Sequence, residues 1–569
     1  FFTPAMLFLP GWVITRYAFV GLGDEEKAVF AFAISILIVS FLGMVIYSLG
    51  PAWDRIHTVL VPVILGSSGF VALRKGLRRS FAASDSVGII AAVLLFLFGL
   101  AFVSLPYKLG DLPLLAFPYA WVVGRTPILP GDPTLPYRLV QFVLNQVDPR
   151  KVVFDAHGWT IADRTPLMGL TAASILSSAS VNVPLTQVGD VIPEVPTPPF
   201  VAFRIVGIFL NSLLLAPAYL LIKDIFNARV ARISMGLLLL NPFMIWGTFY
   251  TSPKSMAAFF VLLSFLLLRK NRVWLSGVAA GLAYLSHNYA AFYLLGMLAY
   301  LVVKRFREGL SFKTILAYTV PAILFIGLWE LWAVVVFGKP SAFYSYVYSG
   351  APLALQLQFR VNNLYRSLVP TYLGPLHDVS TIAYEHTLNS PRLNSYLASQ
   401  LENHPIMGSI VLDYIGSLPG VLMFSVSIFA YVSLWARIRQ VKLDWIFLCL
   451  VPYLTGMLIF SYETFGLAFV YAQPIVPLLT ALAVDSIGDR ILGFVSLTSF
   501  LEHTFMMWGV MYPAYLLPLR LQHLQDGVLL LALSLVYAAV WLLLVSTGSF
   551  GRLTGSFRRI GLNCLGPPP

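Results

Sequence analysis

The sequence predicts an all-α polytopic membrane protein, on two observations. Of its 569 residues, 58% are hydrophobic and 11% are charged, whereas a soluble domain has about 25% charged residues. Apolar runs of about 20 residues also recur along the chain, and a helix of that length crosses the roughly 30 Å hydrocarbon core of a bilayer. Clear examples of these runs are residues 29–49, 87–105, 201–222, 315–337, 410–435 and 528–546.

The start of the chain, its net charge and its cysteines are consistent with that class. The first residues, FFTPAMLFLPGWVITRYAFVG, have no basic start and no small-residue cleavage site, so they predict a first membrane helix rather than a secretory signal. The formal net charge of +12 does not indicate nucleic-acid binding, because the basic residues are spread over short loops. Cys449 and Cys564 provide neither a disulfide framework nor metal-ligand spacing.

Lysine and arginine mark the cytoplasmic loops of a membrane protein, and here they gather in seven clusters. An even number of apolar spans separates each successive pair of clusters, so all seven are predicted to lie on the same face. About fifteen transmembrane helices meet this requirement, with the N-terminus outside and the C-terminus inside. The clusters lie at residues 74–79, 223–232, 269–272, 304–313, 437–442, 490 and 552–559.

Two long segments are then left on the outside, residues 106–199 and 338–405. Loops of this length usually carry function or structure of their own, and we expect them to bear interfacial helices. In the first, the amphipathic stretch 137–147 predicts a helix along the membrane surface. Short outside turns are predicted at 250–254, 286–289 and 461–466.

Ionisable side chains at the outer ends of the spans are the candidate functional residues, because such groups are costly at membrane depth and usually pair or mark a substrate path. Several of mixed sign on one face predict a site that binds an anion through its cations and keeps a carboxylate for acid–base work. The candidates are Asp111 in YKLGDLPL, Asp163 and Arg164 in IADRTPLMG, Arg204, Lys254 in YTSPKSMAAFF, and His287 in GLAYLSHNYAAF.

Each candidate also has a purely structural interpretation. Asp111 is suited to cap a following helix, and the pair Asp163–Arg164 to form an ion pair or an interfacial anchor. Lys254 and Arg204 have the long side chains that snorkel to the membrane interface. A lone histidine such as His287 is more often a satisfied helix-end residue than a ligand. The combination on one face, rather than any single residue, favours a functional site.

The order of these features resembles the GT-C superfamily of integral-membrane glycosyltransferases, especially the protein O-mannosyltransferases and the lipid A aminoarabinose transferases. DRTPL, residues 163–167, is similar to the acidic-basic-Pro-Pro-Leu signature of their first outside loop, with Thr165 in place of the first proline. Residues 203–268 resemble their Arg-led helix, basic cytoplasmic turn and tyrosine-bearing outer turn. GLAYLSHNYAAFYLL and FVYAQPIVPLLTALAV (469–484) resemble two later helices, the second without its usual basic residue.

On this resemblance, which covers roughly residues 87–484, the chain divides into three parts. Residues 1–86 are expected to form accessory transmembrane helices. Residues 87–485 are expected to form the GT-C-like catalytic core with both outside loops. Residues 486–569 are expected to form C-terminal transmembrane helices and a cytoplasmic tail.

The resemblance also implies a reaction, the transfer of a sugar from a polyprenyl phosphate to an acceptor hydroxyl at the outer face. Asp111 would be the general base, Arg164 the leading phosphate ligand, and Asp163 a catalytic-site residue that orients Arg164 or helps to bind the acceptor. Asp111 stands in Gly-Asp-Leu rather than in the family's acidic pair, so Asp132 and Asp155 remain alternatives for the carboxylate. Weaker phosphate-site candidates are Lys254, Arg204 and His287, and the acceptor-side candidates are His157, Trp159, His377 and Glu385.

The expected partners are a polyprenyl-phosphate sugar donor, a glycan, lipid or protein acceptor, and membrane lipids, with no nucleic acid. The expected location is the plasma membrane of a prokaryote, with the site on the extracytoplasmic side. No metal is expected to be obligatory, although Asp163 with His287 leaves a divalent-metal site open.

Three other functions compete with this one. A transporter or lipid flippase would show internal repeats and broken helices with polar residues near the bilayer midplane. The sequence shows no clear repeat, and its charged residues concentrate at the outer ends of the spans. A polyprenyl-linked glycan polymerase or ligase would rely on arginines in a late outside loop, where Arg360, Arg366 and Arg392 lie. A non-enzymatic membrane subunit would tolerate the loss of every carboxylate named above.

Overall fold

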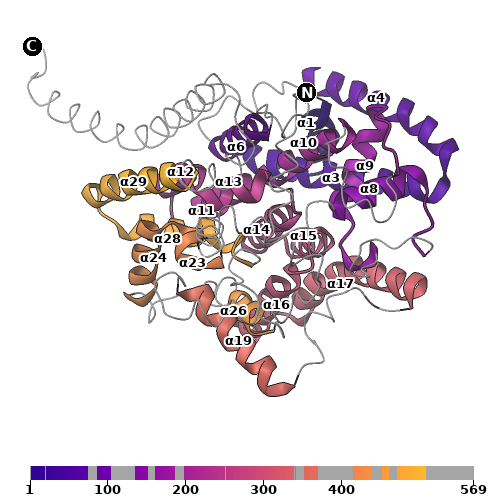
Figure 1. Ribbon diagram of the computed structural model, residues 1–569. Helices are drawn as coiled ribbons and strands as arrows, with labels where there is room; N and C mark the ends of the chain where they lie inside the picture. Colours follow the sequence, from indigo (N-terminus) through magenta and orange to yellow (C-terminus); the bar gives the residue numbers. More distant parts are fainter. Residues whose placement is uncertain are drawn as a thin grey trace, which may run out of the picture.

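The computed structural model of the chain describes residues 2–19, 21–74, 86–103, 135–150, 161–185, 198–249, 251–338, 340, 352–369, 414, 416–436, 451–459 and 471–507. Within these ranges every regular element is a helix (Figure 1). The predicted all-α fold with many apolar helices is therefore confirmed.

The N-terminal part is a group of helices that pack on one another and on the centre of the molecule. Its longest member, α3, begins with three acidic residues, which the positive end of a helix dipole favours. Glu26 also accepts a hydrogen bond from the Gly23 N–H at 3.1 Å, which caps the helix start. The helices are α1 (Phe2–Met6), α2 (Leu9–Ala18), α3 (Asp24–Leu49), α4 (Pro51–Arg74) and α6 (Val87–Val103).

The central helices form the core, and α14 and α15 lie in the middle of it (Figure 1). Every described residue of α14 except its last is buried, so this helix is surrounded by protein rather than lipid. The central elements are α8 (Leu135–Asn145), η2 (Ile161–Asp163), α9 (Leu167–Ser178), α10 (Pro198–Ser212), α11 (Leu215–Ile225), α12 (Ala228–Leu240), α13 (Pro242–Phe249), α14 (Lys254–Arg269), α15 (Val273–Ser286) and α16 (Ala290–Glu308).

The later helices surround this core. Helix α17 packs along α15, α28 packs on α12 and α24, and α26 packs on α16. These helices are α17 (Phe312–Phe337), α19 (Leu353–Leu368), α23 (Leu418–Leu422), α24 (Phe424–Ala436), α26 (Val451–Ile459), α28 (Ile475–Ser486) and α29 (Asp489–Thr504).

Three described helices are long and apolar enough to cross a membrane: Asp24–Leu49, Pro198–Ile225 and Phe312–Phe337. Helices α12 and α13, bent by 66° at their junction, would together make a fourth span. The bend follows Leu240, where Pro242 interrupts the hydrogen-bond ladder and the Asn241 side chain caps the next helix by accepting from the Met244 N–H at 3.1 Å. The predicted total of about fifteen helices stays a prediction.

Charged residues from three helices meet at one end of the core. Glu25 pairs with Lys223 at 3.0 Å, and Asp224 pairs with Arg269 at 2.7 Å and with Lys270 at 3.0 Å. The hydrogen bond to Asp224 raises the pKa of Lys270, because the carboxylate favours the charged ammonium group. These ends of α11 and α14 belong to two of the basic clusters that the sequence assigns to one face, and here they are brought together.

The N-terminal and C-terminal helices pack directly on the core. His57 of α4 is fully buried and lies 3.0 Å from the Ser174 hydroxyl of α9. His503 of α29 lies 2.7 Å from the Leu240 carbonyl of α12. The division of the chain at residues 86 and 485 stays a prediction about function, since helices on both sides of each boundary share buried contacts.

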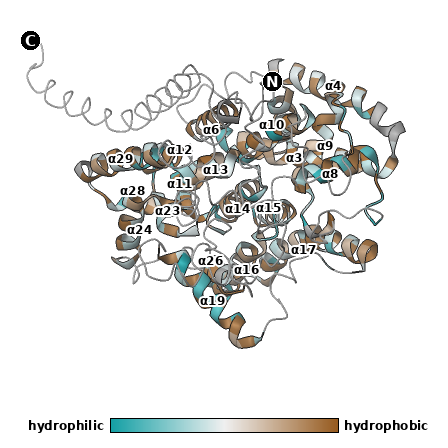
Figure 2. Cartoon of the chain, in the orientation of Figure 1, coloured by the Kyte–Doolittle hydropathy of each residue, from teal (hydrophilic) through white to brown (hydrophobic). Residues whose placement is uncertain are grey.

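Both segments that are predicted to be outside loops contain a described amphipathic helix. Helix α8 (Leu135–Asn145) lies almost where the sequence predicts it, and it packs on α9 and α3. Helix α19 buries Gln356, Asn363 and Arg366 and exposes Leu353 and Val361. Figure 2 shows teal stretches on α19, whereas α17 is mostly brown. The rest of both loops lies largely outside the described residues.

Candidate functional site

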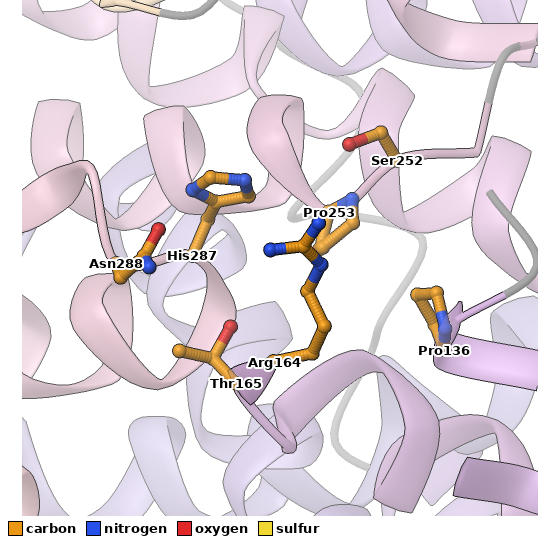
Figure 3. Close-up of a pocket in the computed structure, with 7 residues that line it drawn as sticks. All are labelled: Pro136, Arg164, Thr165, Ser252, Pro253, His287 and Asn288. Carbon is orange, nitrogen blue, oxygen red and sulfur yellow. The ribbon is translucent and has the colours of Figure 1, made fainter. Parts of the chain in front are cut away.

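A small pocket lies at the end of α14 and α15 that is opposite to the ion-pair network. Helix α14 has 16 residues, so its two ends are about 24 Å apart. Four separate segments build the pocket, and Figure 3 shows their side chains around a common space. The described residues that line it are Pro136, Arg164, Thr165, Ser252, Pro253, His287 and Asn288.

Arg164 and Thr165 come from the short link between η2 and α9. Thr165 precedes a proline, which disfavours a helical backbone at Thr165, so α9 begins only after Pro166. The Thr165 hydroxyl donates a hydrogen bond to the Ser286 carbonyl at 2.6 Å. This bond ties the link to the end of α15 and accounts physically for a threonine where the resembled signature has a proline.

His287 ends helix α15 in an extended conformation, and its own N–H donates to the Ala283 carbonyl at 3.0 Å. The Tyr289 N–H donates to His287 Nδ1 at 3.3 Å. In the neutral ring the proton therefore sits on Nε2. In Figure 3 the ring lies beside the Arg164 guanidinium, so the structure brings together two candidates that are 123 positions apart in the chain.

Arg204 and Lys254 are not among the described lining residues. Arg204 is fully buried and donates to the Phe249 carbonyl and, at 2.6 Å, to the Thr251 hydroxyl. Lys254 is 5% exposed and begins α14, where its carbonyl accepts from the Tyr289 hydroxyl at 2.8 Å. Both residues thus support the walls of the pocket, and their predicted part in binding phosphate stays a prediction.

The remaining candidates are not described at the level of side chains. Asp163 is placed by its backbone in η2, next to Arg164. Asp111, the alternatives Asp132 and Asp155, and the acceptor-side residues His157, Trp159, His377 and Glu385 lie outside the described residues. Arg360 and Arg366, which the polymerase alternative would use, are on α19 and are not among the described lining residues.

The later motif FVYAQPIVPLL also reaches this region. Tyr471 packs edge-to-face on Tyr289, with ring centroids 6.1 Å apart, and its carbonyl accepts a hydrogen bond from the Tyr293 hydroxyl. Tyr289 in turn bonds the first residue of α14, so aromatic residues from two distant segments support the His287 turn from behind. Pro474 directly precedes α28 (Ile475–Ser486) as its N-cap residue.

One comparison with known proteins gives a match. Residues 197–332 match the family of dolichyl-phosphate-mannose-protein mannosyltransferases. This family belongs to the GT-C superfamily, which confirms the resemblance seen in the sequence. The match covers less than half of the chain, and it supports a multi-pass membrane glycosyltransferase of the GT-C type with a polyprenyl-phosphate sugar donor. No curated protein and no solved structure matches the chain.

The matched segment includes two polar residues of the pocket that are not among the candidates from the sequence, Ser252 and Asn288. Both lie in predicted short outside turns, but they are uncharged, and only ionisable side chains were collected as candidates. Among the described residues, no group of three His, Cys, Asp or Glu side chains converges to hold a metal ion. The metal requirement stays a prediction.

Proposed function

We propose that the chain transfers a sugar from a polyprenyl-phosphate-linked donor to an acceptor hydroxyl at the outer face of the membrane. The observation that carries this proposal is the pocket that combines Arg164 with His287. It lies at the end of the core opposite to the paired basic clusters, which are the expected cytoplasmic end. A cationic and hydrogen-bonding pocket at that end suits the phosphate of a donor lipid that stands in the outer leaflet.

The proposed reaction is an in-line displacement at the anomeric carbon. The carboxylate of Asp111 takes the proton of the acceptor hydroxyl, and the acceptor oxygen forms the new bond to that carbon. The bond from the anomeric carbon to the phosphate oxygen breaks, and its electron pair leaves with the polyprenyl phosphate. Negative charge grows on the phosphate as this happens, and a guanidinium already in place stabilises it without reorganisation.

Arg164 has the leading part in this scheme, because its planar guanidinium donates two parallel hydrogen bonds to a phosphate group. His287 adds a donor from the opposite segment, since Nδ1 already accepts from the backbone. Asp163 is proposed to orient Arg164 or to help bind the acceptor. Arg204 and Lys254 act from behind the pocket wall. The acceptor is proposed to approach along the outside loops, past His157, Trp159, His377 and Glu385.

The test is sugar transfer by the purified protein in lipid nanodiscs, with a radiolabelled polyprenyl-phosphate sugar and an extract of candidate acceptors. Asp111→Asn should lower kcat by about a hundredfold or more while leaving donor binding unchanged. Arg164→Ala should raise the Kd for the donor about tenfold or more, because a charge-assisted hydrogen-bond pair is lost.

Arg150→Ala is the matched control for Arg164→Ala. Arg150 lies in the same outside loop, is largely exposed and pairs with Asp148 at 3.0 Å, and it is not among the described lining residues. This variant should keep full transfer, since an exposed ion pair contributes little. Retained turnover in Asp111→Asn would refute the assignment of the base. Unchanged donor affinity in Arg164→Ala would refute the phosphate assignment.

A further inference from the structure

We propose that Ser252 is a further ligand-binding residue of this pocket, and that it donates its hydroxyl to a phosphate oxygen of the bound lipid. We also propose that Arg204 and Asn211 are positioning residues that hold Ser252 in place. Both statements rest on the function proposed above. They assign a ligand-binding role to Ser252 and positioning roles to Arg204 and Asn211 that neither the ionisable-residue pattern nor the family match assigns.

The first observation is the hydroxyl of Ser252 itself. The residue is 3% exposed, and its Oγ is buried without a hydrogen-bond partner among the described residues. In Figure 3 this oxygen is directed toward the side of the pocket where His287 and Arg164 lie. A buried polar group without a partner destabilises a protein, so natural structures keep such a group mainly where something else binds to it.

The second observation is that α10 holds the Ser252 turn firmly from behind. The Asn211 Nδ2 donates to the Ser252 carbonyl at 2.9 Å, and its Oδ1 accepts from the Met256 N–H at 3.2 Å. Arg204 donates to the Thr251 hydroxyl at 2.6 Å. Both α10 side chains are fully buried. The turn is thus fixed on both sides of Ser252.

The spacing of these contacts along α10 explains how one helix face holds the turn. Arg204, Gly207 and Asn211 are separated by three and four positions, which places them on the same face of a helix. A Cβ on Gly207 would come within 2.8 Å of Thr251 Cγ2, so the turn packs directly on the helix backbone. Thr251 has φ of +50°, a left-handed conformation that is unfavourable for threonine. The Arg204 bond and the Gly207 contact hold it there.

The third observation is the donor character of the pocket. Arg164 can only donate hydrogen bonds, and the neutral His287 ring donates through Nε2 because Nδ1 accepts from the Tyr289 N–H. None of the described lining residues is acidic. A serine hydroxyl directed toward such a pocket also serves as a donor. The complementary ligand group is an anion with several acceptor oxygens, which describes a phosphate group.

The experiment measures binding to the full-length protein in nanodiscs with two probes, polyprenyl monophosphate and inorganic phosphate. Ser252→Ala should weaken polyprenyl monophosphate binding roughly tenfold, the loss expected for one hydrogen bond to a charged group. The matched control is Ser255→Ala. Ser255 is equally buried, but its hydroxyl donates to the Gly247 carbonyl at 3.3 Å, and it is not among the described lining residues. Its variant should bind as the wild type does.

The positioning role is tested by a double-mutant cycle. Gly207→Ala should displace the Thr251–Ser252 turn and weaken binding of polyprenyl monophosphate by a factor similar to that of Ser252→Ala. If the turn acts through the hydroxyl, Gly207→Ala should have almost no further effect when Ser252 is already alanine. Arg204→Lys can donate to only one of the two acceptors, so it should give an intermediate loss of polyprenyl monophosphate binding. That loss should also disappear when Ser252 is already alanine.

The outcomes separate this inference from the proposed function. A wild-type protein that binds neither probe and transfers no sugar refutes the proposed function itself. If the wild-type protein binds polyprenyl monophosphate, but Ser252→Ala and Ser255→Ala have the same affinity for both probes, this inference alone is overturned. Dependence on Ser252 for both probes supports recognition of the phosphate group itself. Dependence for the lipid alone supports a contact that forms only when the headgroup is anchored. Additive effects in the cycle overturn the positioning role.

Discussion

Helix α3 is predicted to position the pocket through a glycine contact with α9. A Cβ on Gly43 would come within 2.2 Å of the Leu170 carbonyl oxygen, although Cβ contacts shorter than 3.0 Å are essentially not seen. Gly43→Ala must therefore push α3 and α9 apart by about 1 Å. Leu170 lies in the first turn of α9 and only six positions after Arg164, so the displacement should reach the guanidinium.

The magnitude follows from two opposing effects. Overpacking of this kind costs about 1–3 kcal/mol, and the better helix propensity of alanine offsets about 1 kcal/mol of it. The net loss should lower the Tm by a few degrees, since about 1 kcal/mol corresponds to roughly 2–4 °C in domains of 150–250 residues. Transfer should fall more steeply, because a misplacement of about 1 Å at a reacting site costs up to roughly a hundredfold in rate.

The assay is thermal unfolding of the purified protein together with sugar transfer over a range of donor concentrations. The matched control is Gly66→Ala in α4, where an added Cβ meets no atom within 4 Å. That control gives the effect of helix propensity without the clash, and it should keep wild-type transfer. If Gly43→Ala and Gly66→Ala have the same Tm and the same transfer rate, the contact between α3 and α9 at Gly43 does not position the pocket.

Two further predictions concern the two ends of the core. Thr165→Val removes the hydrogen bond to the Ser286 carbonyl, so it should lower the free energy of unfolding by about 1 kcal/mol and raise the KM for the donor. An unchanged KM in a donor titration would mean that this bond does not hold the pocket in place. Asp224→Asn leaves Arg269 and Lys270 without their shared carboxylate and should lower stability by about 1 kcal/mol at low salt. The loss should shrink at high salt, where such partly exposed pairs are screened, and a salt-independent difference in Tm would contradict it.

Much of the architecture is predictable from the sequence because its signals are local. Apolar runs long enough to cross a bilayer and basic loops between them are read residue by residue, and they indicate a helical membrane protein with two distinct faces. The structure pairs Glu25 with Lys223, and Asp224 with Arg269 and Lys270, at one end of the core, as that reading of the basic loops requires. Even the helix in the first predicted outside loop, α8, lies within two residues of the predicted stretch.

The site is less predictable, because it depends on contacts between distant segments. An arginine near the start of an apolar helix looks the same in the sequence whether it binds a ligand or a neighbouring turn. Only the packing of α10 against the α13–α14 turn shows that Arg204 donates to Thr251 and to the Phe249 carbonyl. A fully buried guanidinium must be satisfied wherever it lies, and the tertiary structure decides which acceptors are near.

The same distinction applies to the segment around Arg164. The sequence by itself determined that a charged pair followed by Thr-Pro-Leu comes just before a helix, because proline acts locally, and it predicted that the pair lies outside the spans. Only the tertiary structure decided that Thr165 bonds the end of α15, that Arg164 shares a pocket with His287, and that the uncharged Ser252 lines it too. Helix packing sets those distances, and packing depends on the whole chain rather than on any one stretch of it.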